Sequence, residues 1–181
     1  MVYGDSYIKK LGAEGSISPF FLENVNSSSY DMTLADEFGL PNEVDDYKYK
    51  YIKTHKIYLY TQETLIARSQ EYFKFPDYVS GMVKDKSTLG RSFVTCCNGG
   101  AGWFDPGFEG YAVLEIVNNG YTPFLLQAGM TIGQMIFIEV SGCNKPYNGN
   151  YQNQDSLALD SFEKAVEKLY VKAKKFYIGG Y

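Results

Sequence analysis

Histidine and cysteine are scarce in this chain of 181 residues, which has a single His, His55, and three Cys. One histidine excludes most catalytic constellations and most metal sites that are built on imidazole. Three is an odd number of cysteines, and Cys96 and Cys97 are adjacent, so a framework of disulfides is not indicated. We therefore interpret these two residues and Cys143 as small hydrophobic side chains.

Basic residues are also fewer than acidic ones. The chain has 17 Lys and Arg against 21 Asp and Glu, which gives a net charge of −4. A protein that holds nucleic acid through its phosphates needs the opposite balance, so we expect no nucleic-acid partner.

Long apolar runs are missing as well. Residues 116–138 carry no charge and are long enough to span a bilayer, but they include Asn, Gln, Gly and Pro. Their apolar residues form two short runs, 123–126 and 135–138, which predict two buried strands. The first ten residues lack the apolar core of a secretion signal. We expect a cytoplasmic protein that does not associate with membranes.

What the chain has in quantity is short segments with the composition of strands. Tyr, Phe, Val, Ile and Thr form runs of about five to eight residues between turn-forming Gly, Pro, Asn and Asp. The predicted strands are 17–22, 30–34, 47–54, 56–60, 65–73, 78–84, 92–96, 111–117, 123–126 and 134–140. This spacing indicates one mainly β domain with a closed or double-layered sheet.

Two helices are predicted at the ends of the chain. Near the start, Asp5 is expected to cap a short helix with Tyr7, Ile8 and Leu11 on one face. Near the end, Asp160 and Glu163 form a capping-box-like start to a helix over 161–175. Its apolar face would comprise Phe162, Val166, Leu169 and Ala173. We expect this second helix to pack on the barrel or on a neighbouring subunit.

One carboxylate interrupts a predicted buried strand. In the segment 111–117, Glu115 shares its face with Val113, and both faces are otherwise apolar. Burial raises a carboxyl pKa toward the range in which the group transfers protons at neutral pH, so Glu115 is a candidate general base. The alternatives are an edge strand with Glu115 in water, or a carboxylate paired with a structural Arg.

Two further segments carry polar groups. Residues 85–91, DKSTLGR, combine hydroxyls, cations and a glycine, which suits an anion although the Walker A spacing is absent. The alternative is an ordinary charged turn. In 102–110, GWFDPGFEG, Asp105 enters a turn built on Pro and Gly, where it either bonds its own backbone or accepts from a ligand hydroxyl.

Four segments in order resemble the dCTP deaminase branch of the dUTPase-like superfamily: SSYDMTLADEF (28–38), KSTLGR (86–91), AGWFDPGFEGYAVLE (101–115) and AGMTIGQMIF (128–137). The resemblance spans residues 1–156 and implies a distorted, jelly-roll-like β-barrel that forms a homotrimer with active sites at subunit interfaces. Residues 157–181 would be a C-terminal helical extension of the same domain.

Two features resemble the deaminases rather than plain dUTPases. The deaminases carry a glutamate in the Val-Leu-Glu setting where Glu115 stands. Residues 146–154 resemble the deaminase tail, and the glycine-rich arm with Arg and Phe that closes plain dUTPases is absent. The implied activity is hydrolytic deamination of dCTP to dUTP and ammonia in pyrimidine deoxynucleotide metabolism.

The resemblance also implies a role for each site residue. Glu115 would act as general base and then general acid on a water held by Ser87 and by the carbonyl near Ala101, while Arg91 would stabilise the intermediate. Asp105 would bind the deoxyribose 3′-OH. Lys86, Ser87 and Thr88 would hold the triphosphate, Tyr147 and Gln154 in the tail would close over the nucleotide, and Val113 would be a further substrate-binding residue.

The metal expected from this resemblance is Mg²⁺ bound to the triphosphate, with no ligand from a protein side chain. Zinc deaminases carry an H-x-E and P-C-x-x-C signature, which this chain lacks, so we expect no zinc.

Several departures from the family pattern leave alternatives open. Lys86 stands where deaminases have Arg, Asn150 stands where a tail lysine is expected, and segment 96–100 has one extra residue. The sequence does not separate dUTP release from a bifunctional reaction that gives dUMP and pyrophosphate. A modified cytosine nucleotide as substrate, and a non-catalytic nucleotide-binding protein, also remain as hypotheses.

Overall fold

The structure is a computed structural model that describes residues 1–42, 48–97 and 100–178. Its strands are β1 Ile17–Ser18, β2 Tyr30–Pro41, β3 Tyr49–Lys53, β4 Lys56–Leu59, β5 Thr64–Lys74, β6 Val79–Asp85, β7 Val94–Thr95, β8 Trp103–Phe104, β9 Glu109–Asn118, β10 Phe124–Gln127 and β11 Thr131–Glu139. Its helices are α1 Asp5–Ala13, the 3₁₀ turn η1 Leu22–Asn24, α2 Ser87–Arg91 and α3 Leu159–Ile178. The prediction of a mainly β fold with a helix at each end is confirmed.

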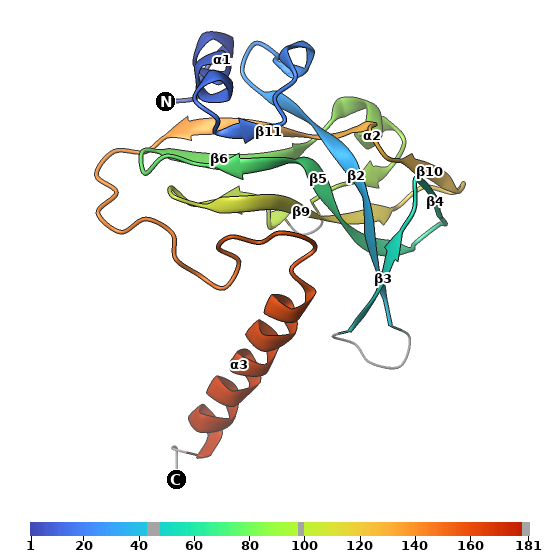
Figure 1. Ribbon diagram of the computed structural model, residues 1–181. Helices are drawn as coiled ribbons and strands as arrows, with labels where there is room; N and C mark the ends of the chain where they lie inside the picture. Colours follow the sequence, from blue (N-terminus) through green and yellow to red (C-terminus); the bar gives the residue numbers. More distant parts are fainter. Residues whose placement is uncertain (43–47, 98–99, 179–181) are drawn as a thin grey trace.

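Most strands belong to one curled antiparallel sheet with the order β7–β9–β5–β2–β11–β6–β8 (Figure 1). Strand β1 adds to β5 and β3 adds to β2, while β4 and β10 form a separate two-stranded sheet. The pairing of β2 with β5 shifts register between Leu34 and Phe38, and that of β5 with β9 shifts between Arg68 and Tyr72. Such irregularities bend strands and allow an open sheet to curl into a half-barrel.

The inside of the curled sheet is filled by aromatic and aliphatic side chains. Phe75 contacts Phe104, Phe108 and Phe137 with ring centroids 5.8–6.2 Å apart. Glycine is required beside this cluster, because a Cβ at Gly81 would lie 2.5 Å from the ring of Phe75. Full burial of each Phe stabilises the fold by about 1.5–3 kcal/mol.

The predicted strands mostly coincide with observed ones, with four differences. Residues 17–22 contain only the two-residue β1, and 92–96 contain only the two-residue β7. The strand predicted over 30–34 continues to Pro41, because Glu37 within it is paired with Arg68 and buried. The strand β8 and the helix α2 were not predicted.

The N-terminal helix exists, but Asp5 is its first residue rather than its cap. Gly4 occupies the cap position, and the Asp5 carboxylate pairs with Lys9 at 2.7 Å. The predicted face is also partly wrong, because Tyr7 is 53% exposed and stacks on Tyr3, whereas Ile8 and Leu11 are buried.

The C-terminal helix leaves the barrel and extends away from it (Figure 1). Its first turn contacts the domain through Phe162, whose ring lies 5.8 Å from that of Tyr49. Leu169 is 67% exposed, so this residue does not pack on the barrel of its own chain, and packing on a neighbouring subunit stays a prediction. Within the described ranges, the structure has no helix that is both long and apolar enough to cross a membrane.

Candidate active site

Strand β9 places Glu115 in a pocket. Ala112, Leu114 and Ile116 point into the core, each at most 1% exposed. The opposite face is only half-buried and presents Val113 and Glu115. The predicted alternation therefore holds, although only one face is fully buried.

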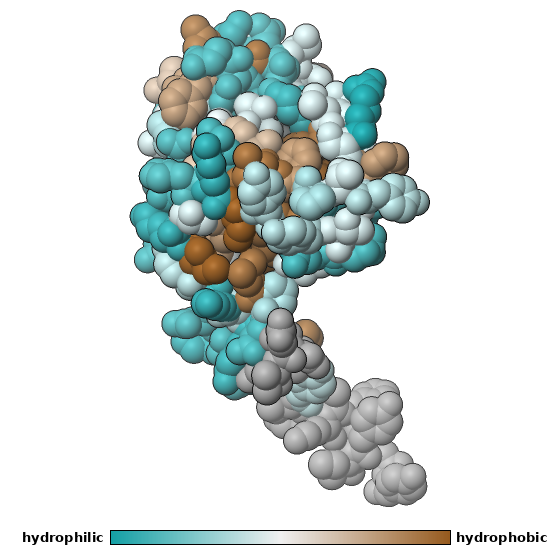
Figure 2. Space-filling model, turned by 90° about the vertical axis from the view of Figure 1, so that its right-hand side faces the viewer, coloured by the Kyte–Doolittle hydropathy of each residue, from teal (hydrophilic) through white to brown (hydrophobic). Residues whose placement is uncertain are grey.

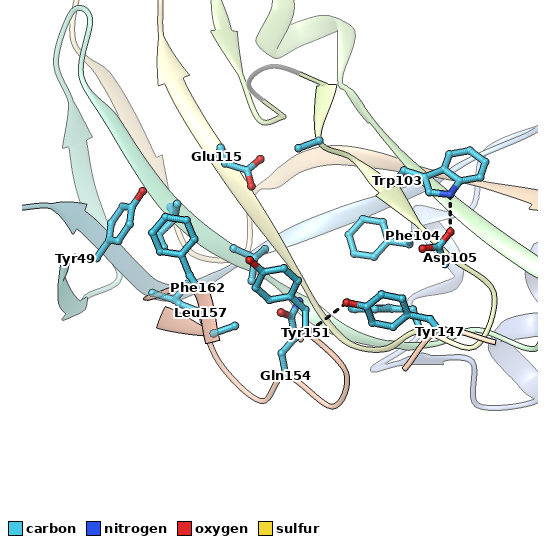
Figure 3. A pocket seen from close by; sticks show the side chains of 15 residues that line it. Tyr49, Trp103, Phe104, Asp105, Glu115, Tyr147, Tyr151, Gln154, Leu157 and Phe162 are labelled. Carbon is cyan, nitrogen blue, oxygen red and sulfur yellow. Dashed lines mark hydrogen bonds between the residues drawn. The ribbon is translucent and has the colours of Figure 1, made fainter. Parts of the chain in front are cut away.

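The pocket has a volume of about 340 Å³ and lies between β9, β3, the turn after β8 and the segment that leads into α3 (Figure 3). Its lining is mostly apolar and aromatic, as in most small-molecule sites. The lining residues are Tyr49, Ile66, Ala101, Trp103, Phe104, Asp105, Phe108, Val113, Glu115, Tyr147, Tyr151, Gln154, Leu157, Ala158 and Phe162.

The Glu115 carboxyl is desolvated. Burial raises its pKa above the ordinary carboxyl value, because the charged form loses hydration. Burial also raises the pKa of Tyr49, and the nearby charge of Glu115 raises it further. A raised pKa makes such a carboxylate a stronger proton acceptor, which suits a general base.

Asp105 and Trp103 form the opposite end of the pocket from Tyr49 and Phe162 (Figure 3). The indole Nε1 of Trp103 donates a hydrogen bond of 3.1 Å to Oδ1 of Asp105. Asp105 is exposed, so its second oxygen can accept from a hydroxyl of a bound molecule.

The segment after residue 140 supplies one wall of the pocket. The Tyr147 amide donates to the Pro106 carbonyl at 2.7 Å, and the Tyr147 hydroxyl accepts from the Tyr151 amide at 3.2 Å. The Gln154 side chain donates to the Tyr111 carbonyl at 2.5 Å. These bonds hold the tail against the start of β9.

The hydroxyls and cations of 86–91 lie elsewhere. Ser87, Thr88 and Arg91 are exposed on α2 and do not line the pocket. Lys86 forms an ion pair with Asp31, whose carboxylate also accepts from Gln134. Within one chain the structure thus brings together six predicted site residues, Ala101, Asp105, Val113, Glu115, Tyr147 and Gln154, and leaves four, Lys86, Ser87, Thr88 and Arg91, apart.

Among the residues that the structure describes, no group of three or more His, Cys, Asp or Glu side chains could hold a metal ion. Cys96 is buried, whereas Cys97 and Cys143 are half-buried, and all three are free thiols. Burial strongly raises the pKa of the Cys96 thiol.

A family model described as dCTP deaminase-like matches residues 2–140. The chain belongs to the dCTP deaminase-like family. The resemblance that the four sequence motifs indicated is therefore confirmed.

Relatives of known annotation support the same family. The chain is 32% identical to "dCTP deaminase, dUMP-forming" of Sulfurihydrogenibium sp. over 169 residues, which cover 85% of this chain and 93% of the relative. It is 31% identical to "dCTP deaminase" of Pyrococcus furiosus over 156 residues, which cover 86% and 96%.

A solved structure supports the fold. The crystal structure of 2′-deoxycytidine 5′-triphosphate deaminase from Agrobacterium tumefaciens matches with a TM-score of 0.64 at 19% identity. The match covers 75% of this chain but only 46% of that chain. At this identity the likeness concerns the fold alone.

Sequence reasoning missed several lining residues of this dCTP deaminase-like site. Trp103 and Tyr151 lie inside segments that carry the resemblance, so the motifs contained the signal. Tyr49, Ile66 and Phe162 come from β3, β5 and α3, and they meet only through long-range pairing and packing. A local sequence pattern does not reveal residues that come together only in the folded chain.

Proposed function

We propose that the protein catalyses hydrolytic deamination of dCTP to dUTP and ammonia. The observation that carries this proposal is the desolvated Glu115 carboxyl in a pocket of a dCTP deaminase-like chain. Relatives whose names state dCTP deaminase cover most of this chain and support the substrate.

In the proposed mechanism, Glu115 takes a proton from water as the oxygen adds to C4 of the cytosine. The same carboxyl then gives the proton to the amine as the C4–N bond breaks. Its raised pKa supports both roles, because burial makes the carboxylate a stronger proton acceptor than an ordinary carboxylate in water. Asp105 binds the 3′-OH of the sugar, and Tyr147 and Gln154 close one side of the nucleotide.

We propose that a second copy of the chain supplies the groups on α2. Ser87 would orient the water, Arg91 would stabilise the intermediate, and Thr88 with Lys86 would bind phosphates. The exposure of Ser87, Thr88 and Arg91 away from the pocket supports this division of the site between copies.

The face around α2 has the character of an interface. Tyr58 and Leu125 are register partners on β4 and β10, and both are exposed, as is Phe93 just after α2. This side of the barrel is on the right in Figure 1 and faces the viewer in Figure 2, where apolar side chains gather between hydrophilic ones. Apolar patches of this kind mark association surfaces. A homotrimer fits both features.

The proposed Mg²⁺ arrives with the triphosphate. Mg²⁺ keeps much of its water and is bound largely by substrate phosphates in most nucleotide sites, so no protein side chain is needed as a ligand. When bound, the ion would neutralise phosphate charge. Independence from zinc remains a prediction.

A second candidate product is dUMP. The relatives from Sulfurihydrogenibium and Persephonella marina carry names that state dUMP formation, at 32% and 30% identity. Incubation with dCTP and Mg²⁺, followed by ion-exchange chromatography, tests both forms. A dUTP peak supports the first reaction, and dUMP with pyrophosphate supports the second. Unchanged dCTP would contradict the proposal.

A further inference from the structure

The pocket continues beyond Glu115 into an apolar chamber, which we define by Tyr49, Ile66, Leu157 and Phe162. Tyr49, Leu157 and Phe162 lie at the end of the pocket away from Asp105, with Glu115 between the two ends (Figure 3). Ile66 pairs with Glu115 across the strands and lies beside the same glycine, Gly39, as Tyr49. Ile66 is 9% exposed and Leu157 is 2% exposed, whereas Tyr49 and Phe162 are half-buried, so two of the four chamber residues are withdrawn from solvent.

The chamber depends on a close approach of three strands. Gly39 on β2 pairs with Ile66 on β5 and lies beside Tyr49 on β3. A Cβ at Gly39 would lie 2.7 Å from Cγ1 of Ile66 and 3.4 Å from Cβ of Tyr49. Because Gly39 has no side chain, the side chains of Ile66 and Tyr49 can both lie at the pocket.

The far wall comes from the C-terminal segment. Phe162 meets Tyr49 edge to face, with ring centroids 5.8 Å apart and an interplanar angle of 72°. Ser156, directly before the wall, donates a hydrogen bond of 2.6 Å to Glu37, and Glu37 pairs with Arg68 at 2.5 Å. The wall is thus fixed to β2 and β5 through buried polar groups.

The chemistry of the chamber selects one edge of the base. With C4 of cytosine at Glu115, one ring neighbour is N3, which accepts a hydrogen bond, and the other is C5, which carries hydrogen. Three of the four chamber residues, Ile66, Leu157 and Phe162, have no side-chain donor, and the Tyr49 hydroxyl is the one donor of the set. An acceptor placed against those three residues would lose its hydrogen bond to water without replacement, so the C5 edge is the one that fits against them.

We propose that the chamber receives a small carbon substituent on C5, so that the substrate class includes 5-methylcytosine deoxynucleotides. This inference rests on the proposed deamination. The reaction balances in the same way: water adds oxygen to C4, the C4–N bond breaks, and ammonia takes the two amine hydrogens and one from water. The second water hydrogen stays on N3, and 5-methyl-dCTP gives dTTP.

The test compares ammonia release from dCTP and from 5-methyl-dCTP by the full-length protein with Mg²⁺. We expect kcat/KM for the methylated substrate to exceed that for dCTP by about fourfold, the factor that one buried methyl supplies. A ratio below one, with dCTP still deaminated, would overturn the inference and leave the proposed function intact. Absence of ammonia from both substrates would overturn both.

Variants of the chamber wall sharpen the test. Leu157→Phe fills the chamber and should bring the ratio below one, whereas Leu22→Phe, the same change at a residue that is 61% exposed on η1, should keep the wild-type ratio. Phe162→Ala enlarges the chamber and should raise kcat/KM for 5-propynyl-dCTP relative to dCTP. Ratios that do not respond to either wall variant would contradict the assignment of the chamber to C5.

Discussion

Ile66 on β5 and Glu115 on β9 are directly paired across two antiparallel strands, and both side chains line the same pocket. The carboxyl therefore has an aliphatic side chain as its cross-strand neighbour instead of a cation. Burial against such a neighbour disfavours the charged form, which accounts for the direction of the pKa shift.

The pH dependence of kcat/KM should reflect the raised pKa of Glu115 beside Ile66. We expect the acidic limb of the profile to lie above the ordinary carboxyl pKa of about 4.3, because Glu115 must lose its proton before it accepts one from water. Ile66→Thr brings a hydroxyl beside the carboxyl and should move the limb to lower pH. An unmoved limb in this variant would assign the titration to another group.

Removal of the Glu115 carboxylate should abolish turnover. Glu115→Gln keeps the size of the side chain and should lower kcat for ammonia release by about 10²–10⁴-fold, with dCTP binding nearly intact by calorimetry. Glu109→Gln is the matched control on the same strand, since Glu109 does not line the pocket and its carboxylate pairs with the exposed Lys74 and accepts from the Tyr72 hydroxyl. Ammonia release at the wild-type rate by Glu115→Gln would refute the assignment.

Mixing experiments should reveal a site shared between copies. Arg91→Ala and Glu115→Gln should each be inactive alone, and co-refolding them in equal amounts should restore about a quarter of the wild-type activity in a cyclic oligomer. The restored sites would combine Glu115 from one copy with Arg91 from its neighbour. If mixtures stay inactive while size measurements show mixed oligomers, both residues act within one chain.

The sugar end of the pocket should discriminate by the 3′-OH. Asp105→Ala should lower kcat/KM for dCTP by about 10- to 150-fold, because a charged hydrogen-bond partner is lost. The same variant should hardly change kcat/KM for 2′,3′-dideoxycytidine triphosphate, which has no 3′-OH. An equal loss on both substrates would indicate that Asp105 acts on the protein rather than on the sugar.

A buried acid outside the pocket should influence stability. Glu71 is 0% exposed and accepts hydrogen bonds from the amide and the hydroxyl of Thr33, yet burial raises its pKa. The folded state therefore binds this proton more tightly than the unfolded state. The stabilisation is complete below the unfolded pKa of about 4.3 and is lost as pH rises through the folded pKa.

Glu71→Gln should accordingly raise the free energy of unfolding at pH 7 and flatten its fall above pH 4.3. Urea unfolding at several pH values measures both effects. Glu14→Gln, at an exposed residue that ends α1, serves as the control. A variant that is less stable than wild type at pH 7 would contradict the sign of the Glu71 effect.

Much of the fold could be predicted because strand composition and turns are local properties. The elements that could not be predicted either depend on contacts with distant segments or are too short to show a pattern. The extension of β2 past Leu34 depends on Arg68, which neutralises Glu37 from another strand. A two-residue strand such as Trp103–Phe104 has too few residues for an alternating pattern.

The site could be predicted in part for a related reason. Glu115 is an anomaly within its own strand, so it was visible in the sequence, and the motif resemblance supplied Asp105 and the tail residues. Arg91 lies outside the pocket although its helix α2 contacts β7, the strand that pairs with β9. No property of either segment alone reveals that placement.

The wall formed by Tyr147, Tyr151, Gln154, Leu157 and Phe162 lies outside the strands of the barrel, in a stretch attached by a few hydrogen bonds. Changes in that stretch alter the shape offered to a nucleotide without disturbing the pairing of the sheet. This wall of the site and the pairing of the sheet are thus encoded by separable parts of the gene. A lineage can diversify the first while selection maintains the second.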